Sequence, residues 1–278
     1  MRKIVYTLIL AVMAVTTYAQ KPVEVELIAH RGGRYEFEEN VLSAFVESYK
    51  KGVRSYETDL RLTADNEIVI SHDATLKRVF GLDVNVEKSS RAELEQCRSA
   101  KGNPVLFADE LAAFFGAKDI RYIEWEMKSK NYTPEQLEIY CDKIYNIVMA
   151  SKPKDALYIF SSFDERALHT MKRLHPEAEC ALIVSAPMSD DLIEHLNALG
   201  LKRVACGVEG TSRKAMKAAH KAGIVVNLWP GKSVEDFQLA VALGADIACT
   251  DIPVEVLKSI KKRTPWITPR KKLTIDNR

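Results

Sequence analysis

The chain has 278 residues, of which 47% are hydrophobic and 28% are charged, a composition typical of a globular protein with one large or two small domains. There are 40 basic and 38 acidic residues, and loss of two basic residues with residues 1–19 would leave 38 of each sign. A formally neutral mature chain gives no electrostatic argument for nucleic acid, so we expect no nucleic-acid partner. The five cysteines match neither a disulfide framework nor a paired-cysteine zinc site.

The first nineteen residues differ from the rest of the chain. Arg2 and Lys3 precede an apolar run that ends in a small-x-Ala pattern at Ala19. The run of roughly thirteen apolar residues is shorter than the ~20 that span a bilayer, which argues against an uncleaved membrane anchor. We therefore predict that residues 1–19 are a signal peptide and that the mature protein is secreted or periplasmic, with no integral membrane segment.

Beyond residue 20, short apolar runs typical of strands alternate with amphipathic segments typical of helices. The expected strands are residues 26–30, 53–59, 122–127, 157–161, 180–185, 203–207, 224–229 and 245–250. The expected helices include residues 40–50, 106–115, 133–150, 164–174, 189–199, 212–222 and 234–243. Strand and helix alternating eight times predict an α/β protein with the (β/α)8 TIM barrel fold.

One further apolar run, residues 68–72, follows Asp59 after only eight residues. A parallel crossover needs a dozen or more residues, so we expect this run to be the return arm of a β-hairpin beside the second strand. Residues 74–105 are then a small insertion after strand 2. The barrel should occupy residues 20–262, followed by a basic C-terminal tail, residues 263–278, of the kind that is usually solvated.

Charged side chains gather where the first strands end, at the face of a TIM barrel on which active sites are built. These are His30 and Arg31, Glu57 and Asp59, His72, and Glu126 and Lys128. Glu57 and Asp59 are two apart on a strand and so share one face, where two buried carboxylates repel unless a cation separates them. With Glu126 as a third oxygen ligand, the set suits a hard divalent cation, Ca²⁺ or Mg²⁺, rather than zinc.

Two histidines, an arginine, a lysine and a hard cation together suit the cleavage of a phosphodiester. Guanidinium and ammonium groups bind phosphate oxygens, and the cation neutralises charge that builds on them. One imidazole can remove a proton from the nucleophile while the other protonates the leaving alkoxide. Gly32 and Gly33, directly after His30 and Arg31, would let the chain turn tightly so that both side chains face the site.

In this order, the motifs resemble those of the glycerophosphodiester phosphodiesterase family, a group of phospholipase-C-like phosphodiesterase barrels. The family pattern runs His-Arg-Gly, Pro-Glu-Asn-Thr, Glu-x-Asp, His-Asp and Glu-x-Lys. It is present here as AHRGG, EENV, YETDLRLTADNEIVISHD and EWEMK, and the similarity continues to the closing LGADIACTDIP. The similarity covers about residues 26–257, and the ordered set is far more specific than any single piece.

The resemblance implies a role for each matching residue. It implies that His30 and His72 are the acid–base pair, that Glu57, Asp59 and Glu126 bind the metal, that Arg31 and Lys128 bind phosphate, and that Glu39 and Asn40 contact or brace the site. The implied activity is metal-dependent hydrolysis of glycerophosphodiesters, small molecules such as deacylated phospholipids, to an alcohol and glycerol phosphate.

The chain departs from the family pattern at two places. Glu38 and Val41 replace the Pro and Thr around the Glu-Asn pair, which affects loop geometry more than chemistry. Residues 229–232 read Trp-Pro-Gly-Lys, where the family usually has Trp-Thr-Val-Asn. We expect Trp229 to form an apolar wall for the alcohol part of the substrate, with Lys232 as an additional phosphate contact.

Other activities remain open at this point. The same chemistry on an intact phospholipid, sphingolipid or inositol phosphodiester would need exposed apolar loops, which residues 105–116 could supply, although a barrel helix suits that segment better. A noncatalytic phosphate-binding barrel is a further alternative. A metal-dependent amidohydrolase would need a His-x-His strand end, and the sequence has none. The sequence leaves open which metal binds and what the oligomeric state is.

Overall fold

The computed structural model describes residues 22–270, so the predicted signal peptide and the last eight residues of the predicted tail lie outside it. Within this range, eight parallel strands form one sheet that closes on itself, since β2 pairs with both β10 and β3. These strands are β2 (Glu26–His30), β3 (Ser55–Leu62), β5 (Tyr122–Met127), β6 (Leu157–Ser162), β7 (Cys180–Pro187), β8 (Arg203–Gly207), β9 (Val225–Gly231) and β10 (Ile247–Thr250). The predicted TIM barrel is confirmed.

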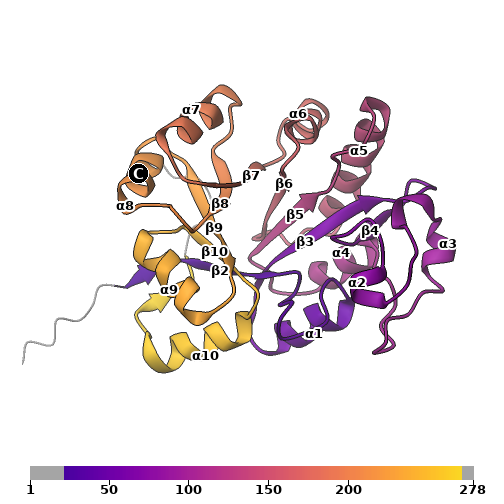
Figure 1. The fold of residues 1–278 in the computed structure, drawn as a ribbon, viewed down its shortest axis with the longest axis horizontal. Helices are drawn as coiled ribbons and strands as arrows, with labels where there is room; N and C mark the ends of the chain where they lie inside the picture. The colour runs from indigo at the N-terminus through magenta and orange to yellow at the C-terminus, as the bar shows by residue number, and fades with distance from the viewer. Residues whose placement is uncertain (1–21, 271–278) are drawn as a thin grey trace, which may run out of the picture.

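Helices surround the strands (Figure 1). They are α1 (Leu42–Lys50), α4 (Ala108–Gly116), α5 (Pro134–Ala150), α6 (Glu165–Leu174), α7 (Asp190–Ala198), α8 (Arg213–Lys221), α9 (Val234–Leu243) and α10 (Pro253–Arg263). Each helix from α5 to α9 begins after a Ser, Thr or Asp whose side chain accepts a hydrogen bond from the first turn. In α4, Leu111 and Phe115 are buried in the core, so the apolar segment 105–116 contributes to the barrel.

The hairpin and the insertion lie beside β3. The strand β4 (Ile68–Ile70) runs antiparallel to β3, as predicted. The insertion carries α2 (Lys77–Phe80), a 3₁₀ helix η1 (Val86–Lys88) and α3 (Arg91–Leu94), which lie together at the right of Figure 1. They enclose a small core of their own, made by Val69, Leu76, Val86, Leu94, Val105 and Phe107. This core fixes the insertion against the hairpin.

Part of the predicted basic tail is structured. The short strand β11 (Ile267–Thr268) pairs in parallel with β1 (Val23–Glu24), and Ile267 is buried in the main core. Beyond it, Arg270 forms an ion pair with Asp246. Burial of one apolar side chain and pairing with β1 thus hold this stretch, contrary to the prediction of a solvated tail. Within the described residues, no helix is both long and apolar enough to cross a membrane.

The turn after β2 has an unusual backbone. Arg31, Gly32 and Gly33 all have positive φ angles, of 52°, 81° and 106°. The turn is closed by a hydrogen bond of 2.8 Å from the Gly33 N–H to the His30 carbonyl oxygen. A Cβ atom at Gly33 would lie 2.9 Å from Cγ of Pro253, the first residue of α10. The two glycines therefore permit both the left-handed turn and its close packing on the last helix.

This packing can be tested with Gly33→Ala and the matched variant Gly52→Ala. Gly52 has a similar φ of 102°, but a Cβ there would meet nothing within 4 Å. Both variants put an alanine at a positive φ angle, and only Gly33→Ala adds a clash with Pro253. We expect Gly33→Ala to lower the free energy of unfolding by about 1–3 kcal/mol more than Gly52→Ala does, measured by urea denaturation. Equal losses would mean that the turn tolerates a side chain.

Candidate active site

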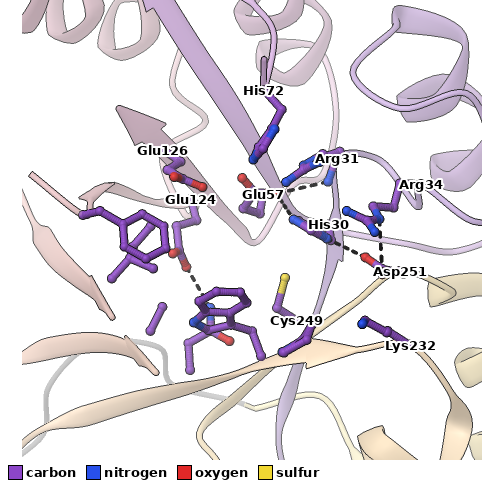
Figure 2. Close-up of a pocket in the computed structure, with 16 residues that line it drawn as sticks. His30, Arg31, Arg34, Glu57, His72, Glu124, Glu126, Lys232, Cys249 and Asp251 are labelled. Carbon is purple, nitrogen blue, oxygen red and sulfur yellow. Dashed lines mark hydrogen bonds and ion pairs between the residues drawn. The ribbon is translucent and has the colours of Figure 1, made fainter. Parts of the chain in front are cut away.

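A cavity of about 290 Å³ lies at the carboxyl ends of the strands. It is lined by His30, Arg31, Arg34, Glu57, His72, Glu124, Glu126, Phe163, Ile183, Ala205, Asn227, Trp229, Pro230, Lys232, Cys249 and Asp251. In Figure 2, Glu57 lies between the two predicted catalytic histidines. Residues from β2, β3, β5, β9 and the hairpin thus meet around one space, as the barrel topology predicts.

The predicted metal ligands Glu57, Asp59 and Glu126 form one cluster. The sheet register pairs Asp59 with Glu126 and places Glu57 next to His30. One oxygen from each of the three carboxylates lies within 4.8 Å of the others, and all three residues are buried. The expectation that Glu57 and Asp59 share one face of their strand is therefore correct.

Burial and mutual repulsion give the three carboxyl groups different pKa values. Burial, reinforced by the charge of Asp59, raises the pKa of Glu57 well above its ordinary value. Burial also raises the pKa of Glu126, to about 7. Burial opposes ionisation of Asp59 too, but the nearby Lys128 and Arg31 outweigh it and hold the pKa of Asp59 well below its usual range. Of the three groups, Asp59 is therefore the one that the protein keeps ionised with its own side chains.

His30 is held by a residue that follows the last barrel strand in the chain, β10. Its Nδ1 lies 2.5 Å from Oδ1 of Asp251, which directly follows β10, and its Nε2 lies 3.7 Å from Oε2 of Glu57. Burial lowers the pKa of His30, although the bond to Asp251 acts in the opposite direction. We had assigned no role to Asp251. The closing segment LGADIACTDIP, which contains Asp251 and is part of the similarity to the family, was the signal that could have identified it.

His72 is held by Asp73, which is in turn bonded to the insertion. Its Nδ1 lies 2.6 Å from Oδ1 of Asp73, and the other Asp73 oxygen accepts a 2.6 Å hydrogen bond from Arg78 of α2. Arg78 also donates to both carboxylate oxygens of Glu39, at 2.7 and 2.8 Å. Partial burial lowers the pKa of His72, against the charge of Asp59. Arg78 was not among the predicted residues, because its position within the insertion gave no indication of this contact.

The two predicted phosphate-binding cations are both anchored on Asp59. The Nε atom of Arg31 lies 3.0 Å from Oδ2 of Asp59, and Nζ of Lys128 lies 3.1 Å from Oδ1. Lys128 also pairs with Glu126, and Arg31 donates to Glu39 at 3.1 Å. Of the two cations, Arg31 lines the cavity, whereas Lys128 is not among the lining residues and pairs with both Asp59 and Glu126. Both guanidinium and ammonium are thus fixed next to the carboxylate cluster.

Glu39 and Asn40 lie behind the cavity wall. Asn40 donates a 2.8 Å hydrogen bond to Asp59 and accepts one of 3.0 Å from Thr58. Glu39 accepts from Arg31 and Arg78. In this structure their contacts are with site residues, so the geometry favours the bracing alternative over direct contact with substrate.

The structure also shows where the residues that depart from the family pattern lie and what they contact. Glu38 accepts hydrogen bonds from Ser99, at 2.8 Å, and from Asn103, which ties its loop to the insertion. Val41 is fully buried just before α1. Trp229 is in the cavity wall, with its ring edge-on to Phe163 at a centroid distance of 6.0 Å.

Lys232 lines the cavity on the side of Asp251 in Figure 2, with an exposed side chain. It lies on the opposite side of His30 from Glu126 in this view. The structure therefore places Lys232 within the same cavity as the predicted catalytic residues, but away from the carboxylate cluster.

Comparisons with known proteins agree with this geometry. The model of the Glycerophosphoryl diester phosphodiesterase family matches residues 30–255. The uncharacterized protein YqiK of Bacillus subtilis is 26% identical over 244 residues, which cover 85% of this chain and 98% of that protein. Human lysophospholipase D GDPD1 is 42% identical over 67 residues, 24% of this chain and 21% of that protein.

The structure of an Oleispira antarctica phosphodiesterase in complex with the product sn-glycerol-3-phosphate has a TM-score of 0.75 and 24% identity, and the match covers 85% of this chain and 97% of that one. A putative glycerophosphoryl diester phosphodiesterase from Silicibacter pomeroyi has a TM-score of 0.76 and 21% identity, over 86% of this chain and 95% of that one. These two structures share the fold. Because the family model spans nearly the whole barrel and every motif of the predicted site, the chain belongs to the glycerophosphoryl diester phosphodiesterase family and is a phosphodiesterase.

Proposed function

We propose that this protein hydrolyses glycerophosphodiesters to an alcohol and glycerol phosphate, with His30 and His72 as the acid–base pair and a divalent cation bound at the carboxylate cluster. The observation that carries the proposal is the arrangement in Figure 2, in which two imidazoles flank Glu57 in one cavity that also contains Arg31. A phosphodiester placed there would have a cationic group and two proton-transfer groups around a single phosphorus atom.

The carboxylate cluster fits a hard divalent cation. Glu57, Asp59 and Glu126 offer oxygen atoms within 4.8 Å of one another, and the buried Oε1 of Glu57 has no hydrogen-bond partner among residues 22–270. Oxygen ligands of this kind suit Ca²⁺ or Mg²⁺. A bound cation would neutralise negative charge that develops on the phosphoryl oxygens. It would also favour the ionised forms of Glu57 and Glu126, whose pKa values are raised by burial and then by the charge of Asp59.

The side chains of the protein supply binding and proton transfer. Arg31, fixed by Asp59 and Glu39, presents a guanidinium group whose orientation is set before substrate arrives. One imidazole accepts the proton of the attacking oxygen as that oxygen bonds to phosphorus. The other imidazole donates a proton to the oxygen of the leaving alcohol as its bond to phosphorus breaks. Asp251 and Asp73 hold the Nδ1 atoms of His30 and His72, which leaves the two Nε2 atoms for these transfers.

The substrate class is the part of the proposal that depends most on comparison. The Oleispira antarctica structure contains sn-glycerol-3-phosphate, which is the product expected from a glycerophosphodiester. The apolar segment that an intact lipid would have needed, residues 105–116, is largely occupied by core packing of α4. This packing supports a small, deacylated substrate over an intact phospholipid, sphingolipid or inositol phospholipid.

We also propose that the protein is exported. This part of the proposal rests on the sequence of residues 1–19, which is typical of a signal peptide. Expression of the full chain in a bacterial host with a periplasm should give a mature protein that begins at Gln20. N-terminal sequencing and cell fractionation test this directly. A protein that retains Met1 or stays in the cytoplasm would contradict export.

The metal can be tested by removal and replacement. Excess chelator should abolish turnover of glycerophosphocholine, because the buried Glu57 and Glu126 would then lack their cation, and Ca²⁺ or Mg²⁺ should restore it. Calorimetric titration of the metal into the chelated protein should show binding that Glu57→Gln weakens. Full activity in excess chelator would exclude a metal-dependent mechanism.

The histidines can be tested by substitution with a matched control. His30→Ala and His72→Ala should each lower kcat by at least about 100-fold, because each removes a proton-transfer group. Asp251→Asn should lower kcat less, since it removes the charge that holds His30 but leaves the imidazole in place. His169→Ala, an exposed residue of α6 outside the cavity, is the control and should keep normal activity. A folded His72→Ala enzyme with most of its rate would remove His72 from the mechanism.

A further inference from the structure

Two cationic side chains line the cavity on the side away from the carboxylate cluster, and the proposed chemistry uses neither of them. They are Arg34, from the turn after β2, and Lys232, which directly follows β9. In Figure 2 both lie beside Asp251, whereas Glu126 lies on the opposite side of His30. The cavity thus has a cationic side that is separate from the carboxylate cluster.

The charge of Lys232 has no partner. Its Nζ atom makes neither a hydrogen bond nor an ion pair within residues 22–270, and the side chain is exposed. The carboxylate in the first turn of α9, Asp236, instead accepts hydrogen bonds from the backbone N–H groups of Lys232 and Ser233, at 2.9 and 3.1 Å. The ammonium group of Lys232 is therefore available to a ligand.

Arg34 is only partly neutralised. Its Nε atom lies 3.3 Å from Oδ2 of Asp251, and its Nη2 atom donates to the Tyr35 hydroxyl at 3.1 Å. The other oxygen of Asp251 contacts His30. In the described part of the chain, Nη1 of Arg34 has no hydrogen bond, and 25% of the side chain is exposed. Asp251 can neutralise only one of the two cations, so this side of the cavity keeps an excess of positive charge.

The backbone before Lys232 is held against the end of β10. The carbonyl oxygen of Gly231 accepts hydrogen bonds from the Asp251 N–H, at 2.8 Å, and from the Thr250 hydroxyl, at 3.0 Å. A Cβ atom at Gly231 would lie only 2.7 Å from the carbonyl oxygen of Cys249. These contacts fix the point from which the Lys232 side chain starts, directly beside Asp251.

The place of Lys232 in the barrel also suits an anion. In TIM barrels, the loops after the seventh and eighth strands frequently bind phosphate, and these strands are β9 and β10 here. The proposed function places the scissile phosphate at groups that follow β2, β3 and β5, the first three strands. An anion bound by Lys232 is therefore a second group and not the phosphate that reacts.

We propose that Arg34 and Lys232 bind a second anionic group, carried by the alcohol that is esterified to glycerol phosphate. The inference rests on the proposed function and specifies its substrate class. The glycerol half of a glycerophosphodiester has no charge beyond the scissile phosphate, so the second anion must belong to the other alcohol. Guanidinium and ammonium groups bind phosphate monoesters and carboxylates alike, and the experiment separates these two sources of charge.

The first measurement compares kcat/KM of the wild-type protein for four glycerophosphodiesters, at saturating Ca²⁺ and low ionic strength. The second alcohol is 1,3-propanediol, 3-hydroxypropyl phosphate, 3-hydroxypropanoate or 3-aminopropanol, so that only the end group changes. We expect about a tenfold preference for the phosphate end, the carboxylate end or both over the hydroxyl end, and the lowest value for the ammonium end. The preference should weaken as salt is added, because salt screens exposed charges.

The second measurement repeats the series with variants of Lys232. The ratio of the preferred anionic substrate to the neutral one should fall below about threefold in Lys232→Gln and persist in Lys232→Arg, whereas Lys232→Glu should favour the ammonium end. Lys217→Gln, at an exposed position of α8 outside the cavity, makes the same change in net charge and should keep the wild-type ratio. An unchanged ratio in folded Lys232→Gln would overturn the subsite.

Arg34 is tested in the same way. Arg34→Gln should also lower the ratio of anionic to neutral substrate, because it removes the second cation. The ratio is the informative quantity, since loss of the contact with Asp251 affects the turnover of all four substrates together. A wild-type ratio in folded Arg34→Gln would contradict a site built from two cations.

The outcome can be separated from that of the proposed function. Equal kcat/KM values for all four substrates would overturn the subsite and leave the proposed chemistry intact. Failure to cleave any of the four diesters would overturn the proposed chemistry. In that case, calorimetric titration with 1,3-propanediol bisphosphate and propyl phosphate tests the subsite alone. Tighter binding of the bisphosphate that is lost in Lys232→Gln but kept in Lys217→Gln would support it, and equal binding would overturn it.

Discussion

The buried charge of Asp59 is the constraint on which the site depends. Its carboxylate is fully enclosed, and a lone carboxylate there would be strongly destabilising. Arg31, Lys128 and Asn40 converge on its two oxygens and keep it ionised. The same contacts fix the positions of the two cations. One buried negative charge thus orients the two cations predicted to bind phosphate and forms one side of the carboxylate cluster.

A chain of polar contacts extends from this charge to the insertion. Arg31 bridges Asp59 and Glu39, and Arg78 of α2 continues from Glu39 to Asp73, which contacts His72. The insertion has its own small apolar core, and Phe80 of α2 packs against it. The segment after strand 2 is therefore part of the site, because it determines where one proposed catalytic imidazole lies. On the other side, Asp251 after β10 does the same for His30.

Much of this arrangement could be predicted from sequence because β-strand periodicity is strict. Alternating side chains place Glu57 and Asp59 on one face, and parallel strands bring their carboxyl ends to one side of the barrel. The hairpin followed from the short connection after β3, which excluded a parallel crossover. The tail was less predictable. Its composition indicated solvation, while the burial of Ile267 and its pairing with β1 depend on a partner strand at the other end of the chain.

By itself, the sequence determined the fold class, the order of the motifs and the residues of the carboxylate cluster, since these depend on local periodicity and on strand ends. The tertiary structure alone decided which distant groups complete them. Asp251 is 221 residues from His30, and Asn227 is 103 residues from Glu124, yet each pair is hydrogen-bonded. A local motif can single out Asp251, but it does not show which residue Asp251 contacts, because the contact arises only when closure of the barrel brings β10 beside β2. The same closure turns β5 and β9 toward one interior.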